Sequence, residues 1–133
     1  MSRILVADLI APEGRALLER HASVDIRTGL SEDELVAIIE PYQALIVRSE
    51  TQVTSRVLAA APTLQVVGRA GVGVDNIDVD AATQRGVVVV NVPAGNTIAA
   101  AEHTMAMMLA MARNIPQADA SLRRGEWNRG AYV

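Results

Sequence analysis

The chain has 133 residues, half of them hydrophobic and 20% charged, a size that suits one domain and is too short for two ordinary ones. This composition excludes an intrinsically disordered chain, and a formal net charge of -3 leaves no broad basic field for nucleic acid or an anionic membrane. Cysteine and lysine are both absent, which excludes disulfides, thiolate catalysis, cysteine zinc sites and Schiff-base chemistry.

Short aliphatic runs alternate with helical patterns from the start of the chain. They predict strands at residues 4–7, 24–26, 44–47, 64–68 and 87–90. Helices are predicted from Pro12, after a capping box of Ser31 and Glu34, after Thr54, and from Asp78 to Arg85. We expect the first helix to turn Leu17 and Leu18 inward.

Aliphatic strands that alternate with helices indicate an α/β fold in which helices cover both faces of a parallel sheet. The expected architecture is a flavodoxin-like open five-stranded sheet of order 2-1-3-4-5 over residues 1–96. A long helix then runs from Asn96 and Thr97 through Arg113. Its interior is apolar nearly all round, so we expect it to be covered on most sides. A second helix ends near Gly125, and the tail 127–133 has no closing element, so the chain looks cut.

Ligands of an open parallel sheet bind beyond the carboxyl ends of the strands, where three polar loops at 48–51, 69–76 and 91–97 can converge. Arg48 offers a planar fork of donors for a carboxylate or phosphate, and Ser49 adds a hydroxyl. A surface arginine in an ordinary salt bridge is the alternative at Arg48. Asn96 lies one step outside a helix, whereas Thr97 reads as a cap.

The sequence Gly71-Val72-Gly73 allows a tight turn whose N–H groups could face an anion. It is not a dinucleotide fingerprint, because Asn76 stands where a third glycine is required. A simple strand–turn–helix connection is the alternative, with Asp75, Asn76 and Asp78 as caps of the next helix.

The remaining titratable and apolar clusters favour structural roles. Glu102 and His103 are adjacent on a helix and point in different directions, and His21 ends the first helix. No pair of histidines has metal-ligand spacing, so no metal site is predicted. The stripe of methionines on the long helix indicates packing; it consists of Met105, Met107, Met108 and Met111. The concentration of large side chains in the tail favours an interface; these are Trp127, Arg129 and Tyr132. Without a signal peptide or a membrane-length apolar stretch, we expect a cytoplasmic protein.

Several motifs in combination resemble the D-2-hydroxyacid dehydrogenases over the whole chain. They are residues 45–49 (LIVRS) with Thr51, residues 67–78 (VGRAGVGVDNID), 91–93 (NVP), 101–104 (AEHT), 113–118 (RNIPQA) and 125–127 (GEW). The resemblance implies a two-domain NAD-dependent oxidoreductase that transfers a hydride from C2 of a small 2-hydroxy acid, here 3-phosphoglycerate.

In such an enzyme residues 1–96 would be the substrate-binding domain. Residues 97–133 would be crossover helices that lead to a nucleotide-binding domain and form a homodimer. The family's catalytic arginine, glutamate and histidine lie far downstream, so His103 is not the catalytic histidine. The resemblance therefore implies no catalytic residue in this chain, which alone is expected to be inactive and to bind no NAD.

The resemblance also assigns expected substrate contacts residue by residue. Arg48 and Ser49 would bind the phosphate or carboxylate end, and Asn96 would hydrogen-bond the substrate. The backbone of Ala70, Gly71, Val72 and Gly73 would approach the carboxylate, with Val72 beside the nicotinamide end of the cofactor. Arg129 would reach the site of the partner subunit.

Three alternatives remain open. Family members often carry a basic residue near Glu50 or Gln52, and this chain has none, so glycerate, lactate or hydroxypyruvate enzymes share the pattern. A free-standing flavodoxin-like binding module is the second alternative, although a receiver domain needs a lysine and a flavin carrier needs stacking aromatics. The third is a structural dimer whose sticky surface is the helix at 105–111.

Overall fold

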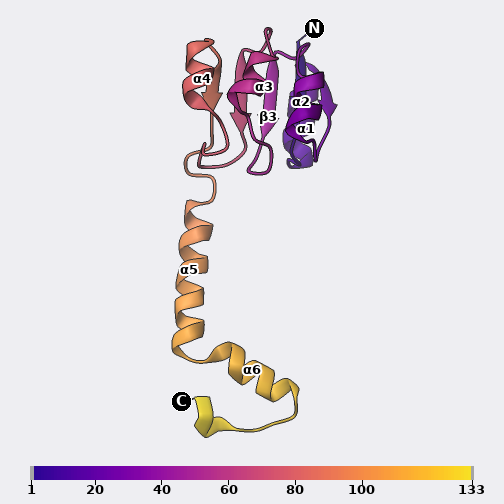
Figure 1. Ribbon diagram of the computed structural model, residues 1–133. Helices are drawn as coiled ribbons and strands as arrows, with labels where there is room; N and C mark the ends of the chain where they lie inside the picture. The colour runs from indigo at the N-terminus through magenta and orange to yellow at the C-terminus, as the bar shows by residue number, and fades with distance from the viewer. Residues whose placement is uncertain (1, 133) are drawn as a thin grey trace. The chain divides into compact units, whose positions relative to one another are not determined.

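The computed structural model describes residues 2–132 (Figure 1). The chain divides into two compact units, one ending at Gly95 and the other beginning at Asn96.

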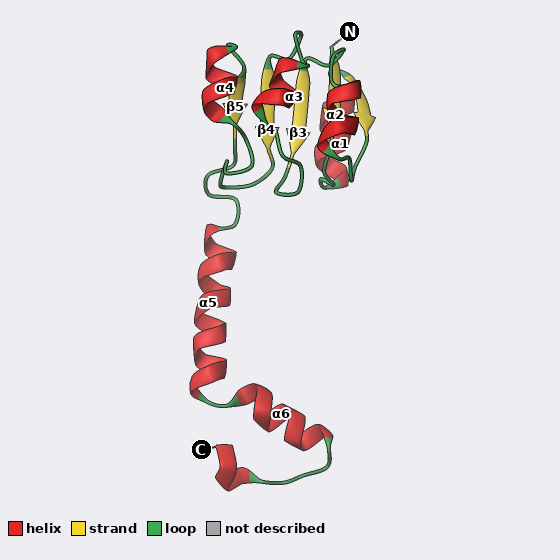
Figure 2. Cartoon of the chain, in the orientation of Figure 1, coloured by secondary structure: helices red, strands yellow, loops and turns green. Residues whose placement is uncertain are grey.

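A five-stranded parallel sheet forms the first unit (Figure 2). Its strands are β1 Arg3–Val6, β2 Ser23–Ile26, β3 Ala44–Val47, β4 Val66–Arg69 and β5 Val88–Val90. They pair in the order β2-β1-β3-β4-β5, so the predicted α/β class and strand order are confirmed. The fourth strand begins later than predicted, because the N–H of Leu64 donates to the Ala61 carbonyl and closes a turn.

The helices of this unit are α1 Pro12–Glu19, α2 Glu32–Ile38, α3 Ser55–Ala59 and α4 Val79–Gln84. Their starts follow the predicted caps. Ser31 and Glu34 form the reciprocal capping box of α2, and Thr54 and Asp78 each accept a backbone N–H of the helix that follows. Local side-chain chemistry therefore places three of the four helix starts.

Side chains of the sheet alternate between two apolar layers. The larger layer holds Leu5, Leu45 and Val67 and is covered by α2, α3 and α4, which supply among others Leu35, Ile39, Val57, Leu58 and Ala82. The smaller layer holds Ile4, Val6 and Ala44 under Leu18 of α1. Leu17 is 56% exposed, so its predicted inward position is wrong; α1 is short and turns only one leucine to the sheet.

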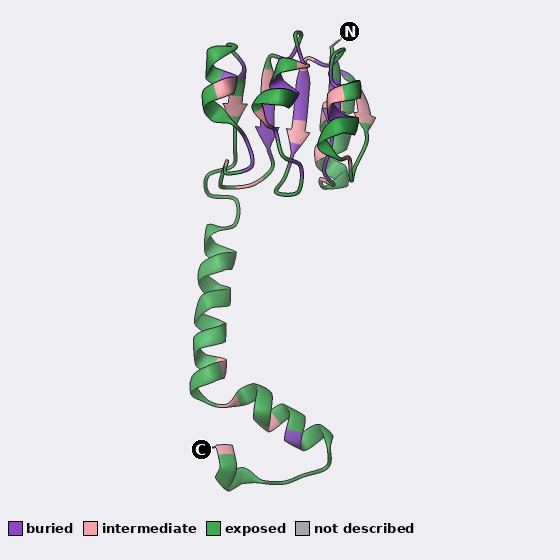
Figure 3. Ribbon diagram, in the orientation of Figure 1, coloured by how far each residue is buried: buried purple, intermediate pink, exposed green. Residues whose placement is uncertain are grey.

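The second unit contains α5 Thr97–Ala112, α6 Ile115–Arg123 and a short 3-10 helix, η1 Arg129–Tyr132. The 3-10 turn corrects the expectation that the tail forms no element. No residue of α5 is buried, contrary to the expectation that it is covered on most sides (Figure 3). Its own unit offers only α6 and η1, which are too small to cover an apolar helix on every side. Within residues 2–132, no helix is long and apolar enough to cross a membrane.

Candidate functional site

The loops after β3, β4 and β5 are joined to one another by hydrogen bonds, as the sequence predicted. The N–H of Ala70 donates to the Val47 carbonyl at 2.8 Å, which joins the second loop to the end of β3. The third loop is held by Asn91, whose Nδ2 donates to the Val72 carbonyl at 2.6 Å, and by the N–H of Val92, which donates to the Gly71 carbonyl. The carboxyl edge of the sheet is therefore one connected surface.

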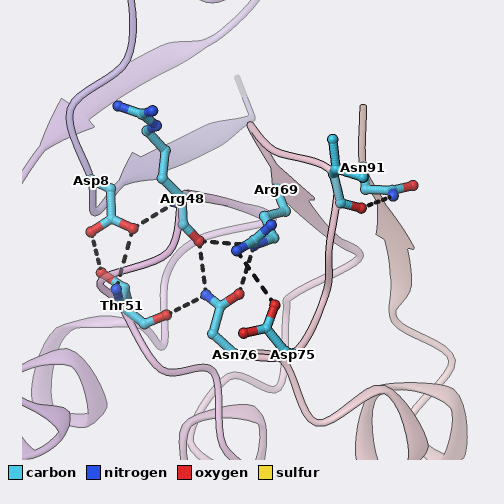
Figure 4. Close-up of polar contacts among 8 residues, drawn as sticks. Asp8, Arg48, Thr51, Arg69, Asp75, Asn76 and Asn91 are labelled. Carbon is cyan, nitrogen blue, oxygen red and sulfur yellow. Dashed lines mark hydrogen bonds and ion pairs between the residues drawn. The ribbon is translucent and has the colours of Figure 1, made fainter. Parts of the chain in front are cut away.

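Asn76 is the hub of this edge (Figure 4). It is buried, and its Nδ2 donates to the carbonyls of Arg48 at 2.8 Å and Thr51 at 2.6 Å. Its Oδ1 accepts from Nε of Arg69 at 2.7 Å. The interpretation of Asn76 as a helix cap is thus wrong, because its amide bridges two loops; Asp78 caps α4 as expected.

Arg69 lies beneath the loop at residues 70–73, called the glycine loop below. Its side chain is 9% exposed, and its Nε also donates to the Arg48 carbonyl at 3.1 Å. Nη2 lies 3.6 Å from the carboxylate of the exposed Asp75. A Cβ added to Gly71 would lie 2.8 Å from Nη1 of Arg69. A larger residue at Gly71 would therefore displace the Arg69 guanidinium, whose Nε is held by two acceptors.

Asp8 supports the same edge from the end of β1. Its carboxylate is buried, with Oδ2 accepting from the backbone N–H of Arg48 at 2.6 Å and of Thr51 at 3.2 Å. Oδ1 accepts from the Thr51 hydroxyl at 2.7 Å. Buried carboxylates are stable only when such donors satisfy them, and here three donors from one loop do so.

Arg48 and Ser49 are exposed, and the Arg48 side chain extends away from the buried network in Figure 4. Among residues 2–132, Arg48 has no ion-pair partner, so the alternative of an ordinary surface salt bridge is not found in the described chain. The side chain borders a cavity of about 420 Å³ that is lined by Asp8, Leu9, Thr28, Gly29, Arg48, Ser49 and Glu50. This cavity can receive an anion on an unpaired guanidinium.

The glycine loop differs from the expected anion nest. The N–H groups of Ala70 and Gly71 are occupied by the carbonyls of Val47 and Arg69. Neither Gly71 nor Gly73 has a positive φ angle, so the alternating conformation that turns successive N–H groups outward is not formed. Among residues 70–73, the N–H groups of Val72 and Gly73 have no acceptor within the described chain.

The other predicted site residues lie in the second unit. Asn96 occupies the N-cap position of α5 and makes no side-chain cap hydrogen bond, and Arg129 begins η1.

Neither histidine belongs to the three loops of the carboxyl edge: His103 lies on α5, and His21 of the first unit precedes β2 at the amino edge of the sheet. Residues 2–132 contain no cluster of three or more potential metal ligands.

Sequence reasoning missed the buried polar residues of this site, which are Asp8, Thr51, Arg69 and Asn76. One signal could have found Asp8 and Arg69, because each places a charge directly at the carboxyl end of a buried strand. A charge at such a position is expensive unless a loop provides partners. Arg48 was found because its fork of donors is recognisable without knowledge of the fold.

A second polar cluster lies near the amino ends of the strands. Nη2 of Arg3 donates to Asp25 at 2.8 Å, and this guanidinium holds the pKa of the Asp25 carboxyl below its usual value. The Tyr42 hydroxyl donates to the same carboxylate at 2.8 Å, and burial raises the pKa of Tyr42. These contacts tie the edge strand β2 to β1 and serve the sheet rather than the candidate site.

Residues 4–127 match the family described as "D-isomer specific 2-hydroxyacid dehydrogenase, catalytic domain". The chain belongs to this family. The resemblance inferred from the motifs is therefore confirmed over nearly the whole sequence.

Curated relatives of this dehydrogenase family share about half of their matched residues with the chain. The D-3-phosphoglycerate dehydrogenase of Synechocystis is 51% identical over 133 residues, and that of Archaeoglobus fulgidus is 50% identical over 132. These matches cover 100% and 98% of the chain but only 24% and 25% of the two relatives. The chain thus spans about a quarter of the length of the curated relatives it matches.

Two solved structures share the fold. The TT0316 protein from Thermus thermophilus is 33% identical with a TM-score of 0.84, covering 95% of this chain and 42% of that one. The 3-phosphoglycerate dehydrogenase of Entamoeba histolytica, solved with NAD⁺ bound, is 27% identical with a TM-score of 0.73. That match covers 82% of this chain and 38% of that chain.

Proposed function

We propose that this chain is the substrate-binding part of an NAD-dependent D-3-phosphoglycerate dehydrogenase, which oxidises 3-phosphoglycerate to 3-phosphohydroxypyruvate in serine biosynthesis. The observation that carries the proposal is the 51% identity to such an enzyme over the entire chain. The unpaired Arg48 at the carboxyl edge of the sheet supports it, because an anionic acid needs a cation there. The cytoplasmic location stays a prediction.

Each proposed substrate contact has a distinct role. Arg48 and Ser49 bind the phosphate or carboxylate end of the acid, and Asn96 donates a hydrogen bond to it. The backbone of Ala70, Gly71, Val72 and Gly73 approaches the carboxylate, and its two unoccupied N–H groups at Val72 and Gly73 are the available donors. Arg129 reaches the site of a partner subunit in the complete enzyme.

We expect the described residues of this chain to form no dinucleotide site of their own. The sequence after β4 lacks the third glycine of the fingerprint, and Asn76 at that position is buried as a bridge between two loops. NAD would therefore be held by the rest of the complete enzyme, with only the exposed Val72 near its nicotinamide end.

Substitution of Arg48 tests the proposal. We expect the amide NMR signals of Ser49 and Gly71 to shift saturably when 3-phosphoglycerate is added to the chain. Arg48→Gln should weaken this binding about tenfold or more, because a charge-assisted bidentate contact contributes more than about 1.4 kcal/mol. Arg124→Gln is the matched control, since Arg124 lies in the second unit and is paired with Glu126.

The proposal would be contradicted by a folded chain in which no acid shifts these signals, or in which Arg48→Gln and Arg124→Gln lower the affinity equally.

A second candidate function is oxidation of an unphosphorylated acid such as glycerate. It is favoured by the cavity lining, where Arg48 is the one cation beside the carboxylates of Asp8 and Glu50. Tighter binding of glycerate than of 3-phosphoglycerate would select it.

We further propose that residues 97–133 form a homodimer contact. Large apolar side chains of α5 are more than half exposed in the chain; they include Ile98, Met105, Met107, Met108, Leu109 and Met111. A soluble monomer rarely leaves such a continuous apolar surface in water. Light scattering should therefore give about twice the monomer mass. Met108→Glu should shift the mass toward the monomer, and a monomeric unsubstituted chain would contradict this contact.

A further inference from the structure

The loop from Arg48 to Thr51 is fixed at both of its ends by buried groups. At Arg48 the N–H donates to Asp8, and the carbonyl accepts from Asn76 and Arg69. At Thr51 the N–H and the hydroxyl donate to Asp8, and the carbonyl accepts from Asn76. Every backbone polar group of these two residues is therefore occupied.

Between these ends, Ser49 and Glu50 are exposed and line the cavity together with the Arg48 side chain. The buried donors and acceptors thus hold the backbone of the loop, while the side chains that face a ligand stay unoccupied. A loop organised in this way loses little conformational entropy when a ligand binds.

The charge of Asp8 is satisfied by hydrogen bonds and not by an ion pair. Its carboxylate accepts three hydrogen bonds from the loop, yet it forms no ion pair within residues 2–132. Arg48, whose own N–H is held at 2.6 Å by this carboxylate, keeps its guanidinium unpaired.

We propose that Asp8 is a positioning residue that presets the loop from Arg48 to Thr51 for ligand binding. It acts through that loop, which supplies all three of its hydrogen bonds. This assignment rests on the proposed function for the identity of the ligand, but the order of the loop is measurable without any ligand.

Amide hydrogen exchange tests the order of the loop. We expect Asp8→Ala to raise the exchange rates of the Arg48 and Thr51 amides at least about tenfold beyond any change at the core amide of Leu45. Asp25→Asn is the matched control. Asp25 accepts side-chain hydrogen bonds from Arg3 and Tyr42 within the same sheet, so its loss should weaken the fold without selectively exposing the loop.

Two conservative changes keep the test decisive if Asp8→Ala does not fold. Thr51→Val removes the hydroxyl that donates to Asp8, whereas Thr51→Ser retains it. We expect faster exchange at Arg48 in the valine variant and restoration of the original rate in the serine variant. Equal exchange in these two variants, or a change at Arg48 no larger than at Leu45, would show that Asp8 serves stability alone.

Measuring the binding of 3-phosphoglycerate distinguishes a failure of this inference from a failure of the proposed function. In a chain that binds 3-phosphoglycerate, Thr51→Val should weaken binding about threefold to tenfold, and Thr51→Ser should restore it. A chain that binds no acid refutes the proposed half-site, but the exchange rates still decide the role of Asp8. Unchanged affinity in a variant with a loosened loop overturns the claim that loop order supports binding.

Discussion

The purified chain is expected to produce no detectable NADH from 3-phosphoglycerate and NAD, even though we expect it to bind the acid. Oxidation at C2 requires a hydride to leave carbon while a base takes the hydroxyl proton. We expect no effective base at the described carboxyl edge, because Asp8 already accepts three hydrogen bonds and the exposed Glu50 has no hydrogen-bond partner among residues 2–132 that would orient it. His21 lies at the amino edge, and His103 lies in the second unit.

NADH fluorescence is the measurement for this prediction. The D-3-phosphoglycerate dehydrogenase of Synechocystis, 51% identical over the chain and about four times as long, is the positive control under the same conditions. NADH formation that scales with the concentration of the chain and disappears in Arg48→Gln would contradict the prediction. It would mean that the chain holds both a hydride acceptor site and a base.

Asn76→Ala is expected to lower the free energy of unfolding of the first unit by about 3 kcal/mol. The substitution removes two donors and one acceptor from a side chain that is 5% exposed. The Thr51 carbonyl then loses its one side-chain donor among residues 2–132, and the buried guanidinium of Arg69 loses one of its two Nε acceptors. Such a loss is a large fraction of the stability of an ordinary domain.

Urea unfolding followed through the ring signals of Tyr42 would measure this change, because Tyr42 is the one aromatic residue of the first unit. Asn128→Ala, at an exposed asparagine, should change the stability by less than about 0.5 kcal/mol. Asn76→Asp keeps the acceptor for Arg69 and loses both donors, so it should also destabilise the unit. If Asn76→Ala is as mild as Asn128→Ala, the hub assignment fails.

Local patterns were sufficient for most of the fold. Aliphatic runs gave the five strands to within about two residues. For the central strands β1, β3 and β4 the reason is that a strand buried on both faces must be apolar at successive positions. The caps Ser31, Thr54 and Asp78 were recognisable because each acts on an N–H only three residues away. Leu17 was misplaced because two adjacent leucines satisfy the same helical pattern, and only packing decides between them.

The candidate site was predictable where its chemistry is carried by one side chain, as at Arg48. It was missed where the chemistry depends on contacts between distant segments. Asp8 meets a loop that lies 40 residues further along the chain, and Asn76 meets the same loop from 28 residues beyond Arg48. The sequence suggested that Asn76 caps a helix, since an asparagine shortly before a helix looks the same locally whether it caps that helix or bridges two loops.

The sequence by itself determined the α/β class, the family and the cation at the carboxyl edge, because periodicity, motif spacing and residue type are local properties. Only the tertiary structure decided that Asp8, Arg69 and Asn76 hold the Arg48 loop, and that the N–H groups of Ala70 and Gly71 are already occupied. Hydrogen-bond partners of buried groups are chosen by the packing of the sheet, which brings together loops that are far apart in the chain.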